Sequence, residues 1–92
     1  MSKYYVYQIR GLLERPDKSI GGIRVIVCTA TQFDEVDIPS DVFDKEILAF
    51  LKYRLAVNDY LDVNKLPWPV LKKIRVPMNR YLDDWILSGN LE

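Results

Sequence analysis

The feature that most constrains this 92-residue chain is the stretch 40–60, in which apolar residues recur at helical spacing. Ser40 and Asp41 follow Pro39, an order typical of a capped helix start that favours negative charge in its first turn. The apolar stripe behind this start consists of Phe43, Ile47, Phe50, Leu51 and Leu55. We therefore expect a helix over about residues 41–60, covered by other elements.

The N-terminal third supplies the expected cover. Residues 3–13 are rich in aromatic and β-branched side chains and predict a strand with Tyr5, Tyr7 and Ile9 on one face. Residues 23–31 predict a second strand, joined to the first through a loop that contains Gly21 and Gly22, which is the pattern of a β-hairpin. Residues 33–38 fit either an edge strand or an extended loop that leads into the helix.

The C-terminal part predicts a second helix. Pro77 is suited to open it, Gly89 to end it, and between them Met78, Tyr81, Leu82, Trp85 and Ile86 share one helical face. The alternative is a longer helix that Pro77 kinks. Residues 69–75 fit a separate short helix, and residues 70–76 fit a strand instead. We predict one α+β domain over residues 1–92: a small antiparallel sheet of two to three strands, built on the N-terminal hairpin and packed against two to three helices.

Charge gives no reason to expect a polyanionic partner for the whole molecule, because 13 basic and 13 acidic residues cancel. The charges are nevertheless segregated: residues 33–64 carry eight acids and three bases, between two mildly basic ends. Acids decorating a loop and a helix start are the simplest interpretation. The alternative interpretation is an acidic docking edge made of Asp34, Glu35 and Asp37.

Residue types argue against independent chemistry. The chain has no histidine and a single cysteine, Cys28, which lies in an apolar run and is expected to be a buried small hydrophobe. We therefore expect no catalytic residues, no metal and no cofactor. The lone cysteine and the absence of an apolar signal sequence or membrane-spanning run predict a cytoplasmic protein without a membrane partner.

Aromatic content favours binding to another protein or to a second copy of the chain. Six tyrosines and two tryptophans exceed what so small a core easily buries, and such rings commonly anchor interfaces. Trp68, held between two prolines, is either a rigidly presented anchor or a plug over the core. The predicted contact residues are Tyr5, Tyr7, Trp68, Tyr81 and Trp85, together with the acidic edge. By analogy, small proteins of this kind often act as inhibitors, adaptors or self-assembling accessory subunits, for instance in phages and mobile elements.

Nucleic-acid binding is the alternative function. Basic residues near stackable rings are the mixture that a single strand requires. The candidate residues are Arg10, Arg15, Lys18 and Arg24 on or near the hairpin, and Lys72, Lys73, Arg75 and Arg80 near Trp68 and Tyr81. A basic helix face exposed to solvent would show the same pattern of residues in the sequence. The acids of residues 34–46 would also repel a polyanion.

Overall fold

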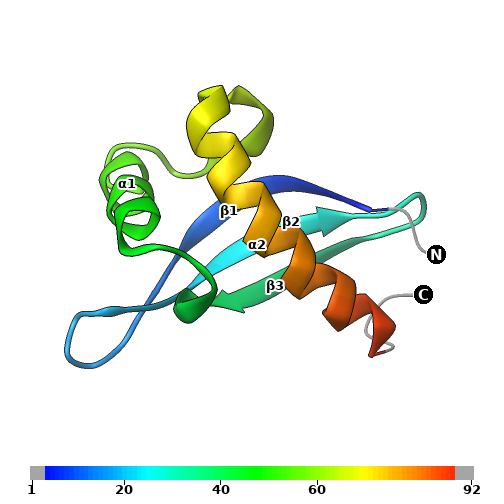
Figure 1. The fold of residues 1–92 in the computed structure, drawn as a ribbon, viewed down its shortest axis with the longest axis horizontal. Coiled ribbons are helices and arrows are strands. Elements are labelled where there is room, and N and C mark those ends of the chain that lie inside the picture. The colour runs from blue at the N-terminus through cyan, green and yellow to red at the C-terminus, as the bar shows by residue number, and fades with distance from the viewer. Residues whose placement is uncertain (1–3, 89–92) are drawn as a thin grey trace.

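Four antiparallel strands form one sheet, in the order β3-β2-β1-β4, in the computed structural model, which describes residues 4–88. Its elements in chain order are β1 (Tyr5–Glu14), β2 (Ile20–Cys28), β3 (Phe33–Pro39), the 3-10 turn η1 (Ser40–Val42), α1 (Lys45–Leu55), β4 (Leu61–Asp62), the 3-10 turn η2 (Val63–Lys65) and α2 (Trp68–Leu87). Helix α2 crosses the three long strands (Figure 1). The α+β class is confirmed, and the two-residue strand β4 adds a fourth strand to the two or three predicted.

Two bulges in β1 decide which of its side chains face the core. β1 advances two residues against one of β2 between Val6 and Gln8, and again between Ile9 and Gly11. Each extra residue resets the alternation of side chains, so Val6 and Ile9 both face the core and are 7% and 0% exposed. Tyr5 and Tyr7 point away. The expectation that Ile9 shares their face is therefore wrong.

The inward faces of β2 and β3 follow simple alternation. In β2, Ile23, Val25 and Val27 share one face by alternation, and all three are fully buried. In β3, Val36 and Ile38 are buried opposite Val25 and Ile23. Residues 33–39 therefore form an edge strand, which resolves the ambiguity of that segment in favour of the strand.

Helix α1 is much shorter than the stretch that predicted it. Phe43 is extended (φ −115°, ψ 153°) and separates η1 from α1, so Asp44 is the N-cap residue in place of the predicted Ser40. The extended backbone lets the Phe43 ring enter the core, where it is 7% exposed. At the other end, the side-chain amide of Asn58 donates to the Arg54 carbonyl at 2.8 Å, which satisfies one of the terminal acceptors of the helix.

Helix α2 has 20 residues and contains Pro77 in its interior. Pro67 is its N-cap and Pro69 lies in its first turn, where a missing N–H costs nothing. The prediction of a helix over about residues 78–88 that begins at Pro77 is therefore wrong. The alternative prediction, one longer helix that runs through Pro77, is confirmed. A proline inside a helix is unfavourable by about 3 kcal/mol in isolation. The fully buried Ile74 and Met78 on either side offset that cost by packing on the sheet.

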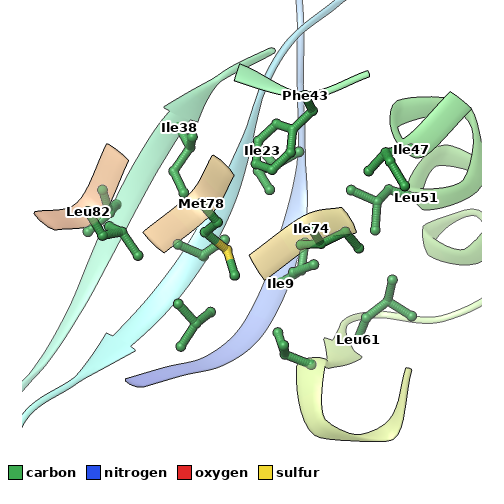
Figure 2. Close-up of a cluster of buried hydrophobic side chains, with 14 of the residues drawn as sticks. Ile9, Ile23, Ile38, Phe43, Ile47, Leu51, Leu61, Ile74, Met78 and Leu82 are labelled. Atoms are coloured by element: carbon green, nitrogen blue, oxygen red, sulfur yellow. The ribbon is translucent and has the colours of Figure 1, made fainter. Parts of the chain in front are cut away.

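The core lies between one face of the sheet and the two helices (Figure 2). Helix α2 contributes Leu71, Ile74, Met78 and Leu82, one residue per turn. Helix α1 contributes Ile47 and Leu51 at the end of the sheet where Leu61 lies (Figure 2). The element that organises the core is therefore α2, not the 40–60 stretch.

Gly22 offers a test of the sheet geometry. A Cβ at this position would lie 2.6 Å from the Ile38 carbonyl oxygen of β3, so alanine must push two paired strands apart. We expect Gly22→Ala to lower the free energy of unfolding by about 1–3 kcal/mol in urea denaturation. Gly11→Ala is the matched control, since a Cβ at Gly11 would meet no heavy atom within 4 Å. Equal stability of the two variants would contradict the close approach of β2 and β3.

Candidate partner-binding face

The sheet presents a second face, which we call the open face, on the side away from the core. Its side chains on the three long strands include Tyr5, Tyr7, Gln8, Arg10, Leu13, Arg24, Ile26, Cys28, Phe33, Glu35, Asp37 and Pro39. The buried residues of α1 and α2 belong to one cluster with the inward side chains of β1, β2 and β3. Both helices therefore cover the same face, and within residues 4–88 the open face carries no helix.

Three aromatic rings gather at one end of the open face. Tyr5, Tyr7 and Phe33 are 55%, 41% and 68% exposed. The Tyr7 and Phe33 rings meet edge to face, with centroids 6.2 Å apart and planes at 77°. Cys28 lies between Tyr5 and Phe33 in the strand register and is buried beneath them. Electrostatic interaction and a hydrogen bond with Cys28 raise the pKa of Tyr5 above its ordinary value.

Charges at the other end of the open face are balanced. The Arg24 guanidinium donates to both carboxylate oxygens of Asp37, at 2.8 and 3.2 Å. This hydrogen-bonded pair lowers the pKa of Asp37 and raises the pKa of Arg24. Arg10 lies over the Tyr60 ring, 5.9 Å from its centroid, and donates to the Gln8 side-chain carbonyl at 3.2 Å. The positive charges of Arg10 and Arg24 are therefore equal in number to the negative charges of Glu35 and Asp37 on this face.

The other predicted contact residues lie elsewhere. Trp68 is 66% exposed at the first residue of α2, so its ring does not plug the core. Tyr81 and Trp85 are half-buried on α2 and pack against the core cluster. Asp34 lies two residues before Val36 in β3, so its side chain is on the same face as Val36, toward the helices. It accepts a hydrogen bond from the Gln32 side-chain amide at 2.8 Å. The predicted contact set is therefore not one surface.

The predicted nucleic-acid residues are also divided. Arg10 and Arg24 lie on the open face, whereas Arg15 and Lys18 lie in the turn between β1 and β2. The remaining four, Lys72, Lys73, Arg75 and Arg80, are exposed on α2, which packs on the opposite face of the sheet. Arg75 donates to the Asn64 side-chain oxygen at 2.9 Å. The bases thus form three separate groups.

Phe33 and Tyr60 are the contact candidates that the sequence reasoning missed. Phe33 precedes Glu35 and Asp37 at two-residue spacing, so the alternation in β3 already places it on the open face. Tyr60 is 46% exposed and precedes β4, whose pairing with β1 could not be inferred from two residues. Strand alternation would therefore have found Phe33, while nothing local indicates Tyr60.

A hollow of about 620 Å³ lies on the helix side of the molecule, along α2. Val42 and Asp44 form one wall, and the other wall comes from α2, where Pro69, Lys72, Lys73, Val76 and Pro77 line it. Val76 is 57% exposed there. This hollow is shallow and mixed in charge, and it shares no residue with the open face.

A hydrogen bond fastens the start of β1 to α2. The Tyr4 hydroxyl donates to the Asp83 carboxylate at 2.9 Å. Partial burial and then this hydrogen bond to a negative group raise the pKa of Tyr4 above its usual value of 10.0. The fold therefore favours the neutral phenol, and this stabilisation is present below about pH 10 and lost as the pH rises above it.

Tyr4→Phe should separate this effect from general alkaline unfolding. At neutral pH we expect the variant to lose about 1 kcal/mol of unfolding free energy, since a hydrogen bond is removed. Between about pH 10 and 12, the wild-type protein should lose stability more steeply than the variant, which has no phenol to ionise at this position. Urea unfolding at neutral and alkaline pH measures both. Parallel pH profiles would contradict the assignment.

Comparison with known proteins gives no match to this chain among family models, curated proteins or solved structures. Among residues 4–88, no three His, Cys, Asp or Glu side chains are placed to hold a metal ion together. In the same part of the chain, neither helix is long and apolar enough to cross a membrane.

Proposed function

We propose that this chain is a small, cytoplasmic, non-catalytic protein-binding domain, acting as an inhibitor, an adaptor or a self-assembling accessory subunit. The observation that carries the proposal is the group of exposed rings on the open face, Tyr5, Tyr7 and Phe33. Contiguous exposed rings on a rigid sheet are typical of interfaces, because they bury a large area and lose little side-chain entropy.

The rigidity of the sheet supports this role. Both tyrosines are on β1, which is hydrogen-bonded to β2 on one side and β4 on the other. Tyr5 on β1 and Phe33 on β3 both pair with Cys28 of β2, so the strand pairing fixes the spacing between them. A partner would therefore meet a surface that is already ordered before binding, which lowers the entropic cost of association.

Charge favours a protein partner over a nucleic acid at this face. Phosphate groups bind where basic side chains outnumber acids. On the open face, Arg24 is neutralised by Asp37, and Glu35 lies beside the rings at two-residue spacing from Phe33. A strand of nucleic acid stacked on the rings would bring its phosphates toward these carboxylates.

Comparative affinity capture tests the proposal. The bait would be the wild-type chain, the double variant Tyr7→Ser/Phe33→Ser and the control Tyr53→Ser, whose ring is 74% exposed on α1. Lysate should come from the organism that encodes the chain. We expect the wild-type and control baits to retain the same protein, or a second copy of the chain, and the double variant to lose it. Retention by all three baits, or by none, would overturn the proposal.

Nucleic-acid binding stays the alternative proposal, favoured by Arg10, which lies on the open face and over the exposed Tyr60 ring. A salt titration of oligonucleotide binding discriminates between the two functions, because phosphate contacts weaken steeply with salt. Measurable low-salt binding that Tyr7→Ser/Phe33→Ser abolishes would support the alternative. Lack of binding at low salt would exclude it.

A further inference from the structure

We propose that the open face binds a second copy of this chain, face to face, about a two-fold axis that runs along β2. This inference rests on the proposed function and names its partner. It follows from the arrangement of rings and charges in the strand register. The rows across the sheet carry one residue from each long strand, and the bulge residues Tyr7 and Arg10 of β1 lie between rows.

An axis along β2 places β1 of one copy over β3 of the other. The row Tyr5, Cys28, Phe33 then meets the same row of the partner, reversed, so Tyr5 faces the second copy's Phe33. Tyr7, already in contact with Phe33 of its own chain, extends this ring layer. Ile26 lies on the axis and meets its own copy. Apolar or aromatic side chains of one copy thus face apolar or aromatic side chains of the other at four positions, Tyr5, Tyr7, Ile26 and Phe33.

The same axis pairs opposite charges. Arg10 is a bulge residue of β1. It lies between the row that leads from Gln8 to Glu35 and the row that leads from Gly11 to Asp37. Placing β1 over β3 brings Arg10 to the acidic strand of the other copy. Arg24 meets its own copy on the axis, where Asp37 already holds each guanidinium, so the charges there alternate and sum to zero.

The other two-fold arrangement is disfavoured by charge. An axis across the strands would place β3 over the β3 of the other copy, running in the opposite direction. Glu35 and Asp37 of both copies would then gather along one edge of the interface and Arg10 of both copies along the other. Like charges opposed in an interface destabilise it, often by several kcal/mol. The distribution of charge between β1 and β3 therefore selects the axis along β2.

The size of the face sets the expected strength. Three strands about 4.8 Å apart and about eight residues long at about 3.3 Å per residue give a face of roughly 14 by 26 Å. This is about 360 Å² per copy and about 730 Å² for the pair, which is below the size of stable specific interfaces and fits a weak, transient one. We therefore expect weak dimerisation, with a dissociation constant of about 100 μM, visible in a concentration series and absent from dilute samples.

A charge-swap experiment tests the axis. The dimer contains two equivalent contacts between Arg10 of one copy and Glu35 of the other. In Glu35→Arg, both contacts set arginine against arginine, and in Arg10→Glu both set glutamate against glutamate. An equimolar mixture restores opposite charges at both contacts. Sedimentation equilibrium from about 1 to 500 μM should show each variant alone dimerising at least tenfold more weakly than the wild type, and the mixture recovering most of that loss. Thermal unfolding of each variant checks that it is folded, since Arg10→Glu removes the Arg10–Tyr60 contact.

A wild-type chain that stays monomeric up to the highest concentration would overturn the proposal. So would a dimer whose variants fail to recover on mixing, because that dimer would use a different axis or surface. In either case, capture of another protein that depends on Tyr7 and Phe33 would leave the proposed protein-binding function intact. Failure of both experiments would remove both proposals.

Discussion

Replacing Leu82 with alanine is expected to lower the free energy of unfolding by about 3–5 kcal/mol, the range for a fully buried leucine whose site cannot collapse. Leu82 is 0% exposed and lies on the α2 stripe with Ile74 and Met78, against the sheet (Figure 2). Domains of this size commonly have only about 5–15 kcal/mol of stability in total. The variant should therefore show a much lower urea midpoint, measured by circular dichroism.

Leu87→Ala is the matched control, because it makes the same substitution on the same helix at a residue that is 84% exposed. We expect its unfolding free energy to change by less than about 0.5 kcal/mol. Similar losses in the two variants would mean that α2 does not present the face to the sheet that the structure shows.

Replacing Tyr7 with threonine is expected to weaken partner binding at least tenfold, which corresponds to about 1.4 kcal/mol. The Tyr7 ring lies at the centre of the exposed ring group and contacts Phe33 edge to face. Threonine removes the ring and, being β-branched, is itself well suited to a strand. Since Tyr7 is 41% exposed, its removal should cost far less in folding than Leu82→Ala.

Tyr53→Ala provides the comparison for Tyr7→Thr. It also removes an exposed tyrosine ring, but from α1, on the other side of the sheet. Isothermal titration with the captured partner, or a dilution series of the chain itself, gives the dissociation constants. Equal weakening by the two substitutions would place the contact elsewhere than on the open face.

The sequence allowed the α+β class and the strand at β2 to be predicted because helical spacing and β-branched runs are local signals. The face of β1 could not be predicted, since the bulges after Val6 and Ile9 arise from pairing with β2 and leave no local signal. The extent of α1 was misjudged for a related reason. The spacing of Phe43 fits the apolar stripe of a helix. In the structure, however, Phe43 is buried with an extended backbone, so α1 begins only after Asp44.

Half of the candidate face was also within reach of the sequence. Tyr5 and Tyr7 were identified as contact residues, although on a strand face wrongly shared with Ile9. The sequence could not show that Tyr81 and Trp85 pack on the core while Tyr5 and Tyr7 are exposed, because amphipathic helices also use aromatic residues on the face that packs on the core. Whether a ring is exposed depends on the layer packed against it, and here that layer is a long α2 that runs through Pro77.

Hydroxyl-radical footprinting of the aromatic residues at low and high protein concentration, and with any captured partner, tests most directly the claim that the open face is a contact surface. We expect Tyr5, Tyr7 and Phe33 to be oxidised readily in dilute solution and to be protected on association. Tyr53 and Trp68 should stay equally reactive in both states. Rings of the open face that are protected even in dilute monomer, or that stay reactive in every complex, would contradict the claim.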